Sequence, residues 1–210
     1  MKLVELHAQA MDLAVDVVDR VRPEHLDRSS PCADWTLGRL LEHCVGQHQG
    51  FAAAARGAGP DLALFADAEL GADPAADFRR TGADLVAAFR AGAADERALW
   101  LPEIRDGGPF PFHLAVGFHL VDTLVHAWDV AAALGGALGG ALGGADALVA
   151  AVDRDDALAD ALLTVTEAVP DTPEARAPGR AFRPGLRPAD GAGRFARALA
   201  LLGRDPAWQA

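Results

Sequence analysis

Four polar side chains interrupt the apolar segment 112–134: His119, Asp122, His126 and Asp129. Their spacings of three, four and three residues place them on one stripe of a helix, because a helix has about 3.6 residues per turn. Apolar residues cover the rest of the segment, so we expect the stripe to face the protein interior. Buried carboxylates beside buried imidazoles are costly unless they are compensated, and a divalent metal ion suits these donors best.

A simpler interpretation of the same stripe is also open. A carboxylate and a histidine four residues apart can hydrogen-bond along one helix without any metal ion. A single buried histidine is usually a core residue whose hydrogen bonds are satisfied. The segment alone does not decide between these interpretations.

A second pair of histidines lies in the segment 37–55, which has helical apolar periodicity. His43 falls in or beside the apolar face, next to Leu40 and Leu41, and is either a metal ligand or a core histidine bonded to a backbone carbonyl. His48 lies about one turn further on and is predicted to be a surface or rim residue.

The two cysteines, Cys32 and Cys44, are too far apart for a C-x-x-C metal motif. We expect free thiols in a reducing cytoplasm. Cys44 is predicted to be a small buried apolar residue. Cys32 lies in a loop before a helix and could be reactive.

The composition excludes several classes of function. The chain has 210 residues, 51% of them hydrophobic, which is enough for one domain with a substantial core. Its formal net charge of −11 gives no electrostatic footprint for nucleic acid and no attraction to an anionic membrane. We find neither a signal peptide nor an apolar run long enough to span a bilayer, so the predicted location is cytoplasmic.

Apolar periodicity predicts mainly helices. A short helical turn is possible near 62–65, a short strand within 97–111, and a β-like stretch near 181–186. The Leu-Gly-Gly-Ala repeat over 134–144 is predicted to be a mobile loop, with a lid over the site as the alternative. The predicted helices are 2–21, 37–55, 74–92, 112–134, 146–169 and 190–203.

Helices that each have one apolar face must bury those faces against each other, so the fold class is all-α, a helical bundle. We predict that residues 1–169 form a four-helix metal-binding bundle. Residues 170–210 are predicted to be a C-terminal extension packed on the bundle, with Trp208 folding back onto it. Metal sites in bundles form between facing helices, so His43 could meet Asp122 and His126.

Three stretches of the chain carry a family resemblance. PCADWTLGRLLEHCVGQHQGF resembles the start of the second helix in the mycothiol-dependent maleylpyruvate isomerase and DinB-like family, and VDTLVHAWDVAAALG resembles that family's second motif. The ending LALLGRDPAW is similar to the tail of many actinobacterial members. The matching motif residues are Trp35, Thr36, His43, Asp122, His126, Trp128 and Asp129.

The resemblance implies a DinB-like four-helix bundle that holds a divalent metal ion, usually zinc or nickel, through three side chains. On this sequence they would be His43, Asp122 and His126. The isomerase has glutamate where this chain has Asp122, which is one methylene shorter. His119 or Asp129 could then serve as a fourth ligand, or as a hydrogen-bonding partner of the ligands.

The implied chemistry follows from an open coordination position, which three protein ligands leave on the metal. A low-molecular-weight thiol such as mycothiol could bind there, lose its proton and attack a small electrophile, as in a thiol transferase or isomerase. Arg39 could hold a substrate carboxylate. The alternatives are a metal-dependent hydrolase with Asp129 or His119 as base, or a non-catalytic metal-binding module. A homodimer is also possible.

Overall fold

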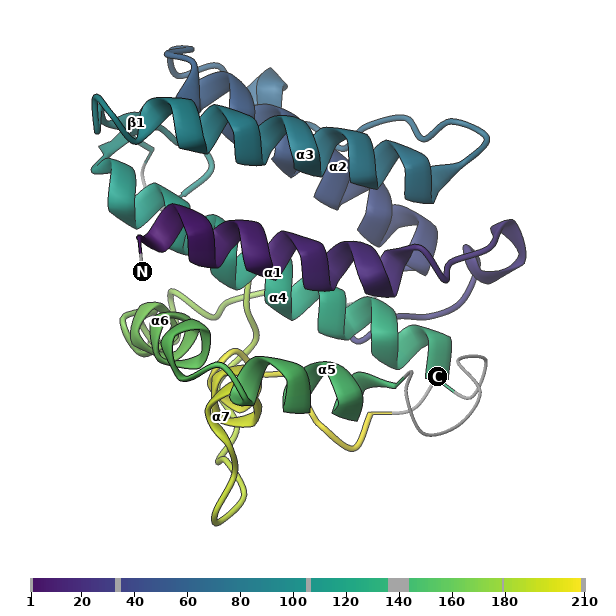
Figure 1. The fold of residues 1–210 in the computed structure, drawn as a ribbon. Helices are drawn as coiled ribbons and strands as arrows, with labels where there is room; N and C mark the ends of the chain where they lie inside the picture. The colour runs from purple at the N-terminus through teal and green to yellow at the C-terminus, as the bar shows by residue number, and fades with distance from the viewer. Residues whose placement is uncertain (1, 33–34, 105–106, 136–143, 179, 209–210) are drawn as a thin grey trace.

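The structure is a computed structural model that describes residues 2–32, 35–104, 107–135, 144–178 and 180–208 (Figure 1). Most of the Leu-Gly-Gly-Ala repeat, at 136–143, lies outside the described residues. The structure therefore tests neither the mobile loop nor the lid predicted there. Within the described ranges, no helix is long and apolar enough to cross a membrane.

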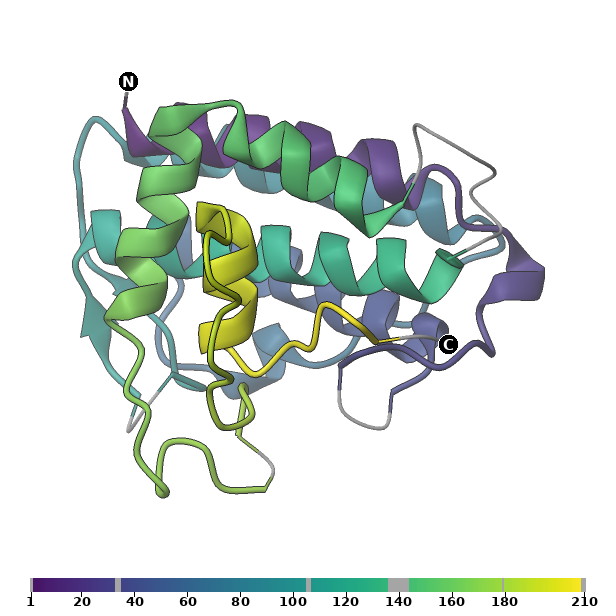
Figure 2. The same cartoon turned by 90° about the horizontal axis from the view of Figure 1, so that it is seen from below.

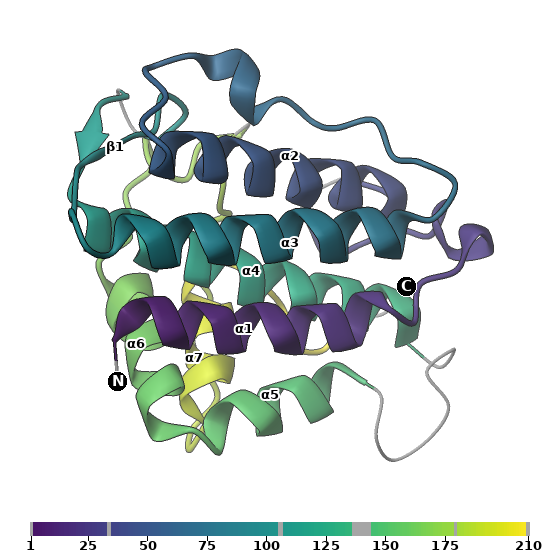
Figure 3. The same ribbon diagram turned by 45° about the horizontal axis from the view of Figure 1, so that its top comes forward.

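Four long helices form a bundle, which confirms the predicted all-α fold class. They are α1 (Leu3–Val18), α2 (Leu37–Ala55), α3 (Pro74–Gly92) and α4 (Phe112–Leu134). The helix α1 packs along α4, α2 packs along α3, and contacts between α1 and α3 and between α2 and α4 close the bundle. Figure 3 shows the four helices running side by side.

Local sequence signals fix the helix ends. Thr36 begins α2 by accepting a hydrogen bond from the backbone N–H of Arg39 at 3.3 Å. Asp73 begins α3 in the same way, with Pro74 in the first turn, where a missing N–H costs nothing. The helix α4 is buried around most of its surface because α1, α2, α5 and α6 all pack on it.

Shorter elements connect and cover the bundle. The predicted helical turn at 62–65 is a 3₁₀ helix, η2 (Leu62–Phe65), and another, η1 (Pro23–His25), follows α1. Instead of one strand, residues 97–111 contain an antiparallel pair, β1 (Leu99–Trp100) and β2 (Pro109–Phe110). The stretch 181–186 contains no strand.

The predicted helix 146–169 is two helices, α5 (Ala145–Asp153) and α6 (Asp156–Glu167). The chain breaks there because the Asp155 side chain accepts a hydrogen bond from the backbone N–H of Leu158 and starts α6 anew. The last helix, α7 (Arg194–Leu201), packs against α5 and α6. Figure 2 shows these three helices covering part of α1 and α4.

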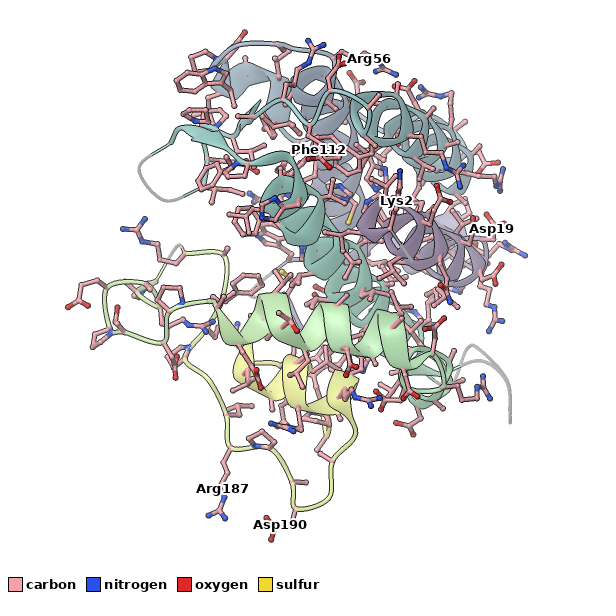
Figure 4. The ribbon with its side chains drawn as sticks, turned by 60° about the vertical axis from the view of Figure 1, so that its left-hand side comes forward. Lys2, Asp19, Arg56, Phe112, Arg187 and Asp190 are labelled. Atoms are coloured by element: carbon pink, nitrogen blue, oxygen red, sulfur yellow. The ribbon has the colours of Figure 1, made fainter. Side chains whose placement is uncertain are left out.

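A buried arginine, Arg176, connects the loop after α6 to the helix α7. Arg176 donates to the backbone carbonyls of Pro170 at 2.9 Å and Leu201 at 3.1 Å, which joins the loop after α6 to α7. Figure 4 shows a loop that projects from the body, with the exposed residues Arg187 and Asp190 near its tip. Trp208 is half-buried near the chain end.

Candidate metal centre

The structure brings together three side chains that the sequence singled out. His43 comes from α2, and Asp122 and His126 come from consecutive turns of α4. One donor atom from each lies within 4.8 Å of the other two. His126 Nε2 is 3.3 Å from Asp122 Oδ1, and the rings of His43 and His126 have centroids 5.4 Å apart.

The group lies in the wall of the bundle and opens to its surface. The exposed fractions of the side chains are 21% for His43, 27% for Asp122 and 9% for His126, so a ligand can reach the group from solvent. Trp35 stands beside the opening with its ring centroid 5.0 Å from that of His43. The guanidinium of Arg39 lies over the Trp35 ring at 5.2 Å.

Each of the two histidines has a carboxylate at its Nδ1 atom. His43 Nδ1 is 3.4 Å from Asp67 Oδ1, and His126 Nδ1 is 3.0 Å from Asp129 Oδ2. A carboxylate at one ring nitrogen holds the proton there and leaves the other nitrogen free for a metal ion, as is usual in metal sites. Sequence reasoning missed Asp67 because it lies in an irregular connection with no periodicity.

Asp129 is completely buried and is held by an arginine from the far end of the chain. Arg204 Nε is 3.1 Å from Asp129 Oδ1, and Arg204 Nη2 is 3.0 Å from Asp129 Oδ2. Burial raises the pKa of Asp129, but the Arg204 guanidinium outweighs burial and the pKa lies below its ordinary value. Asp129 therefore stays ionised as the partner of His126. The only sequence signal for Arg204 was the resemblance of the tail.

Cys32, His126 and Asp129 form a second group whose donor atoms lie within 4.8 Å of one another. Arg204 already supplies positive charge to this group, since its Nη2 also donates to Cys32 Sγ at 3.4 Å. Burial raises the pKa of the Cys32 thiol, which disfavours the reactive thiolate. Cys44 is buried, as predicted, and burial raises the pKa of its thiol well above the ordinary value.

The charges of the His43–Asp122–His126 group suit a cation. Burial raises the pKa of Asp122, but His126 and His43 outweigh burial and hold it well below its usual range. Burial lowers the pKa of His126, but Asp122 and Asp129 outweigh burial and hold it well above the ordinary value. The group thus stabilises a positive charge between its carboxylates. Two imidazoles and a carboxylate fit a zinc or nickel ion in place of that proton.

The remaining histidines of the prediction lie in the core. His119 is fully buried, and its Nδ1 is 2.9 Å from His7 Nε2 and 3.0 Å from Thr123 Oγ1, so the structure does not bring it into the group. The prediction that His48 lies at the surface or rim is wrong: the residue is 2% exposed and its Nδ1 is 3.0 Å from Thr81 Oγ1. The reason is that α3 and α4 both cover this face of α2.

Glu103 adds a titratable carboxyl group near the opening, which sequence reasoning also missed. It follows β1, and its Oε2 accepts a hydrogen bond from Gln47 Nε2 at 3.2 Å, one turn beyond His43 on α2. The residue as a whole is exposed, and its carboxyl is held against the Gln47 side chain of α2. Burial of this carboxyl, together with the negative charges of Asp122 and Asp67, raises its pKa to about 7, although the hydrogen bond from Gln47 acts in the opposite direction.

Comparisons with known proteins agree with this fold. A solved structure, of a variant of the mycothiol-dependent maleylpyruvate isomerase, is similar over 87% of this chain and 74% of that chain, with a TM-score of 0.59 and 13% sequence identity. It confirms the DinB-like helical fold that the sequence resemblance implied.

Sequence comparisons identify relatives and the family. Uncharacterized proteins from two strains of Mycobacterium tuberculosis, CDC 1551 / Oshkosh and H37Rv, are 29% identical over 136 residues, which is 61% of this chain. The match spans 65% of the length of those relatives. The family model described as the mycothiol maleylpyruvate isomerase N-terminal domain matches residues 7–131, more than half of the chain. This protein therefore belongs to the mycothiol maleylpyruvate isomerase N-terminal domain family.

Proposed function

We propose that this protein holds a divalent metal ion, zinc first and nickel second, through His43, Asp122 and His126. We propose further that it activates a low-molecular-weight thiol of the mycothiol type for transfer to, or isomerisation of, a small electrophile. The observation that carries the proposal is the convergence of these three donors within 4.8 Å at an opening to solvent. Membership of a family named for a mycothiol enzyme supports the choice of thiol.

The chemistry would divide between the metal and the chain. A bound metal would supply a positive charge that lowers the pKa of a thiol at its open position. Asp67 and Asp129 keep the two histidine rings oriented. Glu103, as a carboxylate, would take up the thiol proton, and it would return the proton when the thiol leaves after an isomerisation. Arg39, with its side chain 57% exposed beside the opening, is the candidate for holding a substrate carboxylate.

Metal-dependent hydrolysis is the second candidate, and Glu103 is the observation that favours it. A carboxyl with a pKa of about 7 near the opening is suited to act as a general base toward water. The two bases considered from the sequence are less suitable. Asp129 is engaged by Arg204 and His126, and His119 lies in the core with His7.

The first experiment is elemental analysis of protein purified without a histidine tag. We expect about one divalent metal ion per chain in the wild type, and its loss in His126→Ala because three ligands become two. The matched control is His113→Ala, which removes an exposed histidine from the first turn of α4 and should keep the metal. Equal metal contents in the wild type and His126→Ala would contradict the site.

The second experiment gives the protein mycothiol and a panel of small electrophiles, with and without a chelator. Chelator-sensitive consumption of thiol, or chelator-sensitive conversion of the electrophile that requires thiol, supports the proposed function. If the chelator changes neither, the proposed function is overturned. Ester or amide turnover without thiol would indicate the hydrolase. Tight metal binding without either activity would indicate a non-catalytic metal-binding module. Size-exclusion chromatography of the same preparations tests whether the protein is a homodimer.

A further inference from the structure

A small cavity lies inside the bundle, against the candidate metal centre. Its volume is about 10 Å³, which is the space that one water molecule requires. Asp122 and His126 line it on one helix and His48 lines it on another. All four bundle helices contribute to its wall, whose other residues are Val18, Cys44, Phe78, Thr123, Ala127 and Val130.

The contacts of His48 allow its ring proton to be assigned to one nitrogen. Its Nδ1 is 3.0 Å from Thr81 Oγ1, and that hydroxyl is also 2.9 Å from the Asp77 carbonyl oxygen and 3.2 Å from the Phe78 carbonyl oxygen. Carbonyl oxygens only accept, and we assign the single hydrogen of the hydroxyl to one of them. The hydroxyl oxygen then accepts from His48 Nδ1–H, and His48 Nε2 is left with a free lone pair.

This lone pair has no protein partner within the described part of the chain, although His48 is only 2% exposed. Burial lowers the pKa of His48 to about 4, so the ring is neutral at physiological pH and Nε2 remains an acceptor. An acceptor without a protein partner bonds to water where water can reach it. The cavity that His48 lines is the available place for that water.

We propose that this cavity is a binding site for one water molecule, which bridges His48 Nε2 and the metal ion held by His43, Asp122 and His126. The inference rests on the metal binding of the proposed function. It adds a bound water between His48 and the ligand residues, while thiol and electrophile would approach through the exposed parts of His43 and Asp122. His48 is then a positioning residue that acts through the water.

The chemistry of asparagine and glutamine allows a matched test of His48. In His48→Asn, the amide nitrogen falls near the place of Nδ1 and can keep the bond to Thr81, but nothing replaces Nε2. In His48→Gln, the amide oxygen falls near the place of Nε2 and can accept from the water, but the bond to Thr81 is lost. His48→Phe removes the acceptor and fills the cavity while keeping a ring against Phe78, which contacts the His48 ring edge-on.

The probe is Co²⁺, whose visible absorption becomes stronger when its coordination number falls to four. We expect the wild type and His48→Gln to share one spectrum, and His48→Phe to absorb more strongly because it excludes the water. Circular dichroism checks that each variant folds. If His48→Phe does not fold, His48→Asn decides, with an expected change in the cobalt spectrum.

Three results would overturn the inference. One is an unchanged cobalt spectrum in a folded His48→Phe, or in His48→Asn where that variant decides. Another is a spectrum altered by His48→Gln but not by His48→Asn, since His48 would then act only through Thr81. The third is the absence of cobalt binding by the wild type, which would also remove the proposed metal function. If the cobalt spectra are as expected but no turnover is found, the water site is supported and only the proposed thiol chemistry is refuted.

Discussion

At the scale of single residues, the candidate metal centre depends on carboxylates behind the ligands. Asp129 is buried and 3.0 Å from His126, whereas Asp67 is 40% exposed and 3.4 Å from His43. We expect Asp129→Asn to weaken metal binding by roughly 10- to 100-fold, because it removes the charge that holds the His126 proton on Nδ1. Asp67→Asn should weaken metal binding less than Asp129→Asn, since water already screens the contact between Asp67 and His43.

Competition with a chromophoric zinc chelator measures both affinities. The control is Asp95→Asn, which neutralises an exposed carboxylate paired only with Arg97 among the described residues and should leave the affinity unchanged. If Asp67→Asn lowers the zinc affinity as much as Asp129→Asn does, the expectation that the buried carboxylate contributes more than the exposed one is contradicted.

Glu103 gives the centre a pH dependence. Its pKa of about 7 means that its carboxylate form, the one able to act as a base, is populated as the pH rises through that value. A bound cation favours the carboxylate, so in the metal-loaded protein the midpoint should lie at or below pH 7. We expect kcat/KM for thiol addition to rise through this midpoint in the wild type. In Glu103→Gln it should be roughly 10²- to 10⁴-fold lower and should lack this rise.

The pH profile of thiol consumption is the measurement, and Glu69→Gln is the control because it changes an exposed carboxyl in the connection between α2 and α3. A Glu103→Gln profile that keeps the wild-type rate and midpoint would exclude Glu103 as the base.

At the scale of elements, the connection after α2 brings Asp67 to His43. The carbonyl oxygen of Ala66 lies against Gly46 of α2, and the backbone N–H of Ala68 donates to the Glu42 carbonyl oxygen at 2.9 Å. A Cβ at position 46 would collide with that carbonyl, which is backbone and cannot rotate away. Glycine at this position therefore allows the connection to dock on the helix.

We predict that Gly46→Ala destabilises the protein by about 1–3 kcal/mol, although alanine favours a helix more than glycine does. It should also weaken metal binding, because the displaced segment carries Asp67. Urea unfolding and zinc competition measure the two effects. Gly59→Ala is the control, since a Cβ there meets nothing within 4 Å and should change stability by less than about 0.5 kcal/mol. A Gly46→Ala variant as stable as that control would show that the connection docks differently.

The helices that hold the ligands could be predicted from the sequence because their signals are local. Apolar periodicity predicts helices at 37–55, 74–92 and 112–134, which are α2, α3 and α4 of the structure. The motif histidines and Asp122 lie on these helices, so their meeting could be expected once α2 was assumed to face α4.

The rest of the site depends on tertiary contacts that leave no periodic trace. Asp67 and Glu103 reach the centre from irregular connections, and Arg204 reaches Asp129 from 75 residues along the chain. For His48, in contrast, the sequence did contain a signal, but the prediction did not follow it. The residue continues a row of buried α2 residues, and the pattern pointed inward, but the usual preference of histidine for partial exposure gave the wrong prediction.

At the scale of the whole molecule, the bundle encloses three neutral histidines at its centre. His7 from α1, His48 from α2 and His119 from α4 are buried, with ring centroids 5.0 Å apart for His7 and His119 and 5.5 Å apart for His48 and His119. Burial lowers the pKa of His7 to about 3 and that of His48 to about 4, and it holds the pKa of His119 well below the ordinary value. The folded protein therefore excludes protons that the unfolded chain accepts.

This difference predicts that the metal-free protein loses stability as the pH falls. The unfolded histidines bind protons below their ordinary pKa of about 6.5, whereas in the folded protein the pKa is about 3 for His7, about 4 for His48 and well below the ordinary value for His119. Each should therefore cost about 1.4 kcal/mol per pH unit as the pH falls from about 6.5 toward its folded pKa. His43, whose pKa burial also lowers, acts in the same direction as the three central histidines. Glu103 acts in the opposite direction between about pH 7 and 4.5, and the ordinary carboxylates titrate mainly below this window. Urea unfolding at several pH values, with a chelator present, measures the slope. His7→Leu should reduce the slope of stability against pH by about the contribution of one histidine. The control His113→Gln, at an exposed histidine, should keep the wild-type slope. A stability that does not depend on pH between 6 and 4.5 would show that the central histidines are not neutral in the folded state.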